Sequence, residues 1–421
     1  MSWYMVMQLV AYGAQDVYLT GNPKVTFFQA VYRRHTNFAM ENIEQTVNGT
    51  AGNNGRVSVT VARNGDLISD MYIELKSKAN LNQFTGSVAD SLWAAERAIK
   101  DVELSIGGQR IDKHYQRWWR LYSELYLDES KKATWSKMCT PGTVAESTIY
   151  LPLIFFFNRN PGLALPLIAL QYHEVRLDFD LSSDFTDYTD GTTFKVWGNY
   201  VYLDTEERRR FAQKGHEYLI EQLQHTGTDS LAAGGQTKQI RLSYNHPVKE
   251  LVWCADKGGV TSSNLWNFTS GSPVLTSNVA NVVADSNVLM ATSQSGAPLL
   301  LSGTENGAPW TEELAGPIDT FKLVLNGQDR FKEQEGKYFN QVQAFQHHTG
   351  SPMPGVYSYS FALKPEEHQP TGTCNFSRID NAQVAIKTKD ITGVPTSLNM
   401  FAVNYNVLRI QSGMGGLSFS S

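Results

Sequence analysis

The segment Val102–Trp118, with the sequence VELSIGGQRIDKHYQRW, recurs in altered form at Phe321–Phe339 as FKLVLNGQDRFKEQEGKYF. Each copy begins with alternating apolar and polar residues, continues with Gly-Gln and an Arg, and ends in a stretch of helical character. The pair Gly108-Gln109 aligns with Gly327-Gln328. Because successive side chains point to opposite faces of a strand, this pattern predicts a half-buried β-strand, followed after Gly-Gln and an Arg by a helix, in both places.

Two further pairs of segments follow the same order along the chain. DMYIEL, from Asp70, parallels ELVWCA, from Glu250, and GNYVYLD, from Gly198, parallels VNYNVLR, from Val403. Three parallels in one order predict that a single β-rich unit was duplicated. The distance in sequence between the two copies is larger for the Val102 and Phe321 segments than for the Asp70 and Glu250 segments. The second copy is therefore expected to hold an insertion before Phe321. Gly258–Gly316, which is rich in Ser, Thr, Asn and Gly, is that expected insertion.

Short strands dominate the rest of the chain. Alternating apolar and polar residues predict strands at Val57–Val61, Met71–Leu75, Val175–Leu181 and Val196–Leu203. Helices are expected to be few, and the main candidates are Lys113–Met138 and the shorter Phe331–His347. The apolar run Ile149–Leu170 is too interrupted to span a membrane and is predicted to form a buried strand, a turn and a short core helix. The pattern favours an all-β protein built from β-sandwiches.

The composition narrows the classes of function. The chain has 421 residues, a net charge of -5 and only 18% charged residues. Direct coating of nucleic acid is disfavoured, because such affinity comes largely from Lys and Arg. A weakly charged surface favours burial against other subunits. Three widely spaced cysteines, Cys139, Cys254 and Cys374, form no disulfide framework or zinc pattern, which is typical of a reducing compartment of cytoplasmic character.

Motifs for chemistry are missing from the sequence, so no catalytic, cofactor-binding or metal site is predicted. His173-Glu174 and His216-Glu217 begin like zinc motifs but lack the second His at helical spacing. His347-His348 are adjacent, which suits a surface or a helix cap more than a ligand pair. The protein is therefore not expected to be an enzyme.

Other polar or aromatic groups are also given structural interpretations. Asp184, Asp187 and Asp190 are expected in a solvated loop, Arg208–Arg210 in salt bridges, and Trp118-Trp119 in the core. The sequons at Asn48, Asn267 and Asn375 are read as chance matches, because no secretory signal precedes them.

The N-terminal region is the most distinctive part of the sequence. Gly21-Asn22-Pro23 predicts a turn, and the mixture of aromatic and basic residues that follows suits docking against a neighbour or an underlying layer. The residues expected to make these contacts are Phe27, Phe28, Tyr32, Arg33 and Arg34.

Three segments resemble a known family. LVAYGAQDVYLTGNPKVTFFQAVYRRHTNFA (Leu9–Ala39) is similar to the N-terminal signature of major capsid proteins of nucleocytoplasmic large DNA viruses, above all those of algae and other protists. RNPGLALPLIALQYHEV (Arg159–Val175) and NYNVLRIQSGMGGLSFS (Asn404–Ser420) look like two further signatures of the same family. The resemblance thus extends over the whole chain.

The resemblance implies two tandem eight-stranded jelly-roll β-sandwiches with a few short helices and long loops. It also implies a homotrimer that forms a pseudo-hexagonal capsomer and tiles the icosahedral shell of a large double-stranded DNA virus. The expected partners are the chain itself, neighbouring capsomers, minor capsid proteins and the internal viral membrane, with no direct contact to nucleic acid and no cofactor. The expected location is the virion capsid, after synthesis and assembly in the host cytoplasm.

On this basis the expected organisation is an N-terminal arm (1–25), a first jelly roll (26–212), and a second jelly roll (213–421) with a long inserted loop (258–316). The five aromatic and basic residues of the N-terminal region would then lie at the capsomer base, and the inserted loop on the capsid exterior. Alternatives are a capsid paralogue, or a surface attachment or glycan-binding β-sandwich protein. A β-sandwich enzyme acting on glycans would need a carboxylate pair across a cleft.

Overall fold

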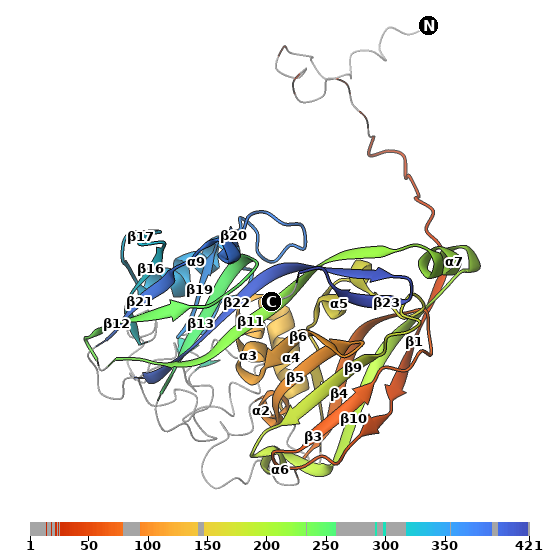
Figure 1. Ribbon diagram of the computed structural model, residues 1–421, viewed down its shortest axis with the longest axis horizontal. Coiled ribbons are helices and arrows are strands. Elements are labelled where there is room, and N and C mark those ends of the chain that lie inside the picture. The colour runs from red at the N-terminus through yellow and green to blue at the C-terminus, as the bar shows by residue number, and fades with distance from the viewer. Residues whose placement is uncertain are drawn as a thin grey trace, which may run out of the picture. The chain divides into compact units, whose positions relative to one another are not determined.

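A computed structural model describes residues 26–78, 93–141, 147–232, 234–257, 317–353, 355–389 and 395–419, with 291–292, 298–299 and four single residues before position 26. The chain divides into two compact units, Met1–Asn37 and Phe38–Ser421. The larger unit contains all the sheets (Figure 1). The greater part of the predicted insertion at 258–316 lies outside the described residues.

The first half of the larger unit forms two antiparallel sheets. Sheet A has the strand order β1 (Phe38–Gln45), β10 (Thr189–Leu203), β4 (Leu67–Ser77), β7 (Thr148–Pro152), with β8 (Leu165–Pro166) also paired to β4. Sheet B has the order β2 (Val47–Asn48), β3 (Arg56–Thr60), β9 (Val175–Leu181), β5 (Ile99–Ile106), β6 (Gln109–Tyr115). All four strands predicted from alternation are therefore present, as β3, β4, β9 and β10.

The second half repeats this construction. Sheet C has the order β11 (His216–Ser230), β22 (Pro395–Gln411), β13 (Pro247–Lys257), β19 (Val356–Ser360), with β20 (Cys374–Asn375) on β13 and β23 (Met414–Leu417) on β22. Sheet D has the order β12 (Thr237–Leu242), β21 (Ala382–Thr388), β16 (Ile318–Leu325), β17 (Gln328–Asp329), with β18 (Gln334–Glu335) on β16. A separate pair joins β14 (Ala291–Thr292) to β15 (Pro298–Leu299).

The two halves have the same topology. When the eight main strands of each half are numbered along the chain, their sheets both run 1-8-3-6 and 2-7-4-5. Two four-stranded sheets connected in this way form a jelly roll. The fold is thus all-β, with two tandem eight-stranded jelly rolls, as the sequence predicts.

The repeated segments occupy equivalent places in the two jelly rolls. The segments at Asp70 and Glu250 lie on the third strands, β4 and β13, and those at Gly198 and Val403 on the eighth strands, β10 and β22. The fourth and fifth strands are joined in both halves by a two-residue hairpin turn. Both turn residues have positive φ, 58° and 83° at Gly107-Gly108 and 51° and 79° at Asn326-Gly327, which is the type I′ geometry that favours Gly and Asn.

Short helices lie between the strands. They are α2 (Ala94–Ala98), α3 (Gln116–Leu125), α4 (Glu129–Cys139), α5 (Phe156–Arg159), α6 (Phe185–Tyr188), α7 (Thr205–Gln213), α9 (Gln343–His347), the 3-10 helices Pro161–Leu163 and Phe376–Arg378, and the π-helix Tyr338–Val342. The run predicted as a strand, a turn and a short core helix forms β7, α5, the first 3-10 helix and β8. No helix in the described part of the chain is both long and apolar enough to cross a membrane.

Both helix predictions need correction. The run Lys113–Met138 begins with the last residues of strand β6 and then forms two helices, α3 and α4. A separate second helix begins after Asp128, because this residue is the N-cap of α4 and its side chain accepts a hydrogen bond from the Lys131 amide. In the run Phe331–His347, Gln334–Glu335 form strand β18, which pairs with β16, and the helical part follows it. In both places cross-strand pairing after the hairpin outweighs the local helical pattern.

Candidate assembly interface

The predicted contact residues of the N-terminal region all belong to the smaller unit, Met1–Asn37. Phe27, Phe28 and Tyr32 are 100%, 99% and 90% exposed, and Arg33 and Arg34 are exposed as well. Large apolar side chains in this state favour a partner surface. Their role as contacts remains a prediction.

Within the larger unit, the two jelly rolls meet along an apolar interface. Side chains of β13 alternate: Leu251 and Trp253 pack inside the second jelly roll, whereas Val252 and Cys254 join the hydrophobic cluster of the first. All four are fully buried. Sheet C therefore buries both of its faces, one against sheet D and the other against the first jelly roll.

The surface of the first jelly roll that covers sheet C comes from β6 and α3, which lie beside β11 and β22 in Figure 1. The Trp118 ring lies 5.7 Å from that of Phe401, and the amide of Leu223 donates to the Asp112 carboxylate at 3.0 Å. Trp118 and Trp119 are 3% and 0% exposed, which confirms the prediction that they are core residues.

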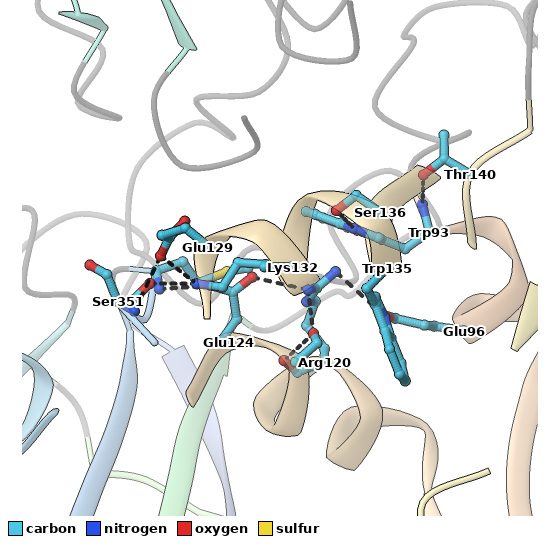
Figure 2. Close-up of polar contacts among 12 residues, drawn as sticks. Trp93, Glu96, Arg120, Glu124, Glu129, Lys132, Trp135, Ser136, Thr140 and Ser351 are labelled. Atoms are coloured by element: carbon cyan, nitrogen blue, oxygen red, sulfur yellow. Dashed lines mark hydrogen bonds and ion pairs between the residues drawn. The ribbon is translucent and has the colours of Figure 1, made fainter. Parts of the chain in front are cut away.

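A first group of buried charges crosses this interface (Figure 2). Arg120 pairs with Glu124 at 3.0 Å and with Glu96 at 3.5 Å, and Lys132 pairs with Glu124 at 3.3 Å. Lys132 Nζ also donates to the Ser351 carbonyl of the second jelly roll at 2.7 Å. Burial raises the pKa of Glu96, although Arg120 counteracts it. Two acids and two bases balance in charge, as burial requires.

A second group lies farther along the same interface. Arg159 of the first jelly roll pairs with Glu221 of the second at 2.9 Å, and Lys249 pairs with Glu221 at 2.5 Å. Burial alone would raise the pKa of Glu221, but Arg159 and Lys249 hold it below its usual range. The hydroxyl of Tyr126 donates to Glu250 at 2.5 Å.

His348 belongs to this second group. It is the C-cap residue of α9, which is one of its two predicted places, but its side chain is not on the surface. Its side chain has no exposed surface, and its two ring nitrogens bond to Glu250 and Glu366. Burial would lower the pKa of His348, but the two carboxylates raise it to about 9. Because Glu250 lies far away in the sequence, the pair His347-His348 gave no sign of this ion pair.

The other residues singled out in the sequence have structural surroundings. Arg208 pairs with Asp66 at 3.0 Å and Arg209 with Glu206 at 4.0 Å, as salt bridges were predicted there. His173 Nδ1 contacts the Gly415 backbone, and His216 Nε2 lies 2.8 Å from the Phe211 carbonyl. Within the described ranges, no group of three or more His, Cys, Asp or Glu residues could hold a metal ion.

Two of the three sequons can be placed. Asn48 and Asn375 are exposed, whereas Asn267 lies outside the described residues. The predicted acidic loop is wrong for two of its three residues, because Asp187 belongs to the short helix α6 and Asp190 to strand β10. The three cysteines are free thiols, and Cys139 and Cys254 are buried.

The fold and the interface together define a double jelly-roll protein whose two sandwiches are joined into one block. A family model for the large eukaryotic DNA virus major capsid protein matches residues 207–416, and one for the major capsid protein N-terminus matches residues 26–204. The chain belongs to this family of major capsid proteins, which confirms the resemblance seen in the sequence.

Individual relatives agree along almost the full length. The major capsid protein of Paramecium bursaria Chlorella virus 1 is 44% identical, over 98% of this chain and 99% of the relative. That of Phaeocystis pouchetii virus is 40% identical over 99% of both. A quasi-atomic model of the PBCV-1 virus capsid matches with a TM-score of 0.78 and 41% identity, over 94% of this chain and 100% of that one. The Faustovirus major capsid protein shares the fold, with a TM-score of 0.66 at 13% identity.

Proposed function

We propose that the chain forms a homotrimer, a pseudo-hexagonal capsomer that tiles the icosahedral shell of a large double-stranded DNA virus. The observation that carries this proposal is the duplication of one jelly roll with identical strand order. Three chains then supply six similar sandwiches, so a threefold block offers nearly equivalent edges in six directions. The likeness to a protein described as part of a virus capsid supports the same role.

The buried charges give the block its rigidity. The Arg159–Glu221 ion pair and the hydrogen bond from Lys132 to the Ser351 carbonyl join the two jelly rolls. Separating the two sandwiches would take Arg159 away from Glu221 and Lys132 away from the Ser351 carbonyl, and removing a partner from a buried charge costs several kcal/mol. A subunit that must hold a fixed angle between its halves benefits from such a joint.

Light scattering on the purified protein tests the trimer. Three chains of 47.0 kDa predict a stable species of about 141 kDa. If the protein is a monomer at every concentration below that at which it aggregates, the proposal is contradicted. We propose a structural role without catalysis, and hydrolysis of polysaccharides by the purified trimer would contradict that part.

We further propose that the N-terminal region faces minor capsid proteins or the internal viral membrane at the capsomer base. Exposed Phe27, Phe28 and Tyr32 beside Arg33 and Arg34 support this role. The double variant R33E/R34E is expected to form normal trimers but to lose the attached inner layer in assembled particles. Particles of normal composition from this variant would refute the assignment. Assembly is expected in the host cytoplasm.

The domain boundaries also remain a proposal: an arm at 1–25 and jelly rolls at 26–212 and 213–421, with 258–316 raised on the capsid exterior. The two family models, which meet between residues 204 and 207, support a division near α7. Limited proteolysis tests it, since first cuts are expected within 258–316 or in the arm, with the α7 joint intact.

A further inference from the structure

A polar cavity of about 560 Å³ lies between the two jelly rolls. One wall belongs to the first jelly roll and includes Lys100 of β5 and Arg117 of α3. The opposite wall belongs to the second jelly roll and includes His225 and Thr228 of β11. Cavities of this size at the junction of two domains are common sites for small molecules. Because most of the lining side chains are polar, this cavity suits a polar ligand.

An irregularity in strand pairing occurs in each wall of the cavity. In the first jelly roll, the register of β5 against β9 shifts between Ile99 and Asp101, so Lys100 is an extra residue of β5. In the second jelly roll, the register of β11 against β22 shifts between His225 and Thr228. A β-bulge turns a side chain out of the regular alternation and is common beside functional sites. Both walls thus carry side chains that strand pairing alone does not account for.

Lys100 differs in its surroundings from the equivalent residue of the second jelly roll. With the offset of the two Gly-Gln segments, Lys100 corresponds to Asp319, and the same register shift occurs there. Asp319 forms an ion pair with Lys387 at 2.7 Å. Lys100 is exposed and has no ion-pair partner among the residues that the structure describes. The first copy therefore holds a cation at this bulge that the second copy replaces by a satisfied ion pair.

The wall from the second jelly roll has no counterpart in the first. Gln45 of β1 and His225 of β11 pair with equivalent positions of β10 and β22. Strand β1 ends at Gln45, whereas β11 continues through its bulge and includes Thr228. The cavity therefore depends on a part of the second copy by which it differs from the first.

The neutral form of His225 offers a hydrogen-bond acceptor. Its Nδ1 lies 3.0 Å from the Met400 carbonyl, which can only accept, so Nδ1 carries the proton. Burial lowers the pKa of His225 and the Arg117 charge adds to this, although the carbonyl and Asp229 counteract it. The neutral ring keeps Nε2 as an acceptor. The Thr228 hydroxyl donates at 2.8 Å to the asparagine opposite, and its oxygen can still accept.

The charges around the cavity favour an anionic ligand. Among the described residues that line it, Asp101 is the single acid, and Lys113 pairs with this carboxylate at 3.0 Å. The Lys100 charge therefore has no balancing acid in the lining. Arg117 lines the cavity as well. A guanidinium has five N–H donors, so Arg117 can keep its contacts within the protein and still donate to a ligand.

We propose that this cavity binds a sugar unit that bears a carboxylate, the chemical class of the uronic acids. The carboxylate pairs with Lys100, and ring hydroxyls donate to His225 Nε2 and to the Thr228 oxygen. A plain anion would leave these two acceptors unused, and a neutral sugar would leave Lys100 without a counter-charge. The site adds glycan binding to the proposed structural role, and it does not depend on how many chains form the capsomer.

Isothermal titration calorimetry of the full-length protein with methyl glucuronide measures the binding. Two comparison probes are methyl glucoside, which has no carboxylate, and acetate, which has no hydroxyl groups. Each is expected to bind at least about tenfold more weakly than methyl glucuronide. Absence of binding of methyl glucuronide at tens of millimolar would overturn the proposal, and so would an equal affinity for either comparison probe.

Variants locate the site. K100E is expected to weaken methyl glucuronide binding at least about tenfold, because it replaces an attracting charge by a repelling one. K214E, at an exposed lysine outside the cavity lining, is the matched control and should bind like the wild type. H225F keeps a ring that can pack on Phe401 but lacks Nε2, and should weaken binding about three- to tenfold. Wild-type affinity in K100E or in H225F would overturn the assignment.

Light scattering on K100E separates this site from the assembly of the capsomer. The variant is expected to have the oligomeric state of the wild type. A different state would assign Lys100 to a contact between subunits and would overturn its role in the cavity. If the wild type itself is not a trimer, the proposed function fails while the ligand measurements still decide the site.

Chemical protection tests the site without any variant. The wild-type protein is acetylated with an N-hydroxysuccinimide ester, and mass spectrometry measures the modified fraction of each lysine. Methyl glucuronide is expected to slow acetylation of Lys100 and to leave Lys214 unchanged, whereas methyl glucoside should protect neither. Equal acetylation of Lys100 with and without methyl glucuronide would contradict the proposal.

Discussion

Protonation of His348 should make the stability of this protein depend on pH between about pH 6.5 and pH 9. The ring lies between Glu250 and Glu366 with no exposed surface, and its pKa is raised from 6.5 to about 9. A folded-state pKa above the unfolded value means that the stabilisation is fully present below about pH 6.5. It is lost as the pH rises through about 9.

The magnitude follows from the same shift. Since one pKa unit corresponds to about 1.4 kcal/mol, the protonated histidine contributes about 3 kcal/mol at low pH. Solvent screening does not reduce this figure much, because the side chain is buried. The variant H348Q lacks the titrating group, so it should lose that contribution and the associated pH dependence.

Urea unfolding of wild type and H348Q at a fixed protein concentration measures the effect, because unfolding of an oligomer depends on concentration. The difference in free energy of unfolding between the two proteins should shrink by about 3 kcal/mol from about pH 6 to about pH 10. H35Q, which removes an exposed histidine, serves as the control and should follow the wild type. A difference between wild type and H348Q that stays constant over this range would refute the reasoning.

Two other predictions concern single positions. K132M should lower the free energy of unfolding by about 3–5 kcal/mol, because it removes a partner of the buried Glu124 carboxylate. K131M, at the exposed neighbouring position, should change the free energy of unfolding by less than about 0.5 kcal/mol. Equal effects of the two variants in urea melts would contradict this prediction. G107A should destabilise more than G108A: φ is positive at both, but a Cβ at 107 would lie 2.4 Å from a histidine ring and one at 108 has nothing within 4 Å. Thermal melts that rank the two glycine variants in the opposite order would exclude this explanation.

Much of the architecture can be predicted from local sequence. Alternation predicted β3, β4, β9 and β10, and the parallel Gly-Gln segments predicted two equivalent strands, β5 and β16. These features are local, since strand faces alternate with every residue. The helix limits were missed because β6 and β18 depend on pairing with other strands, and a helical period in the sequence carries no information about that pairing.

The sequence by itself determined that one β-rich unit is present twice, and in which order its strands occur, because alternation and turn residues are written in contiguous segments. Only the tertiary structure decided that sheet C buries both of its faces, and that His348 is an ion-pair partner of Glu250. Neither could be read from the chain, because burial depends on residues that are distant in sequence and brought together by packing.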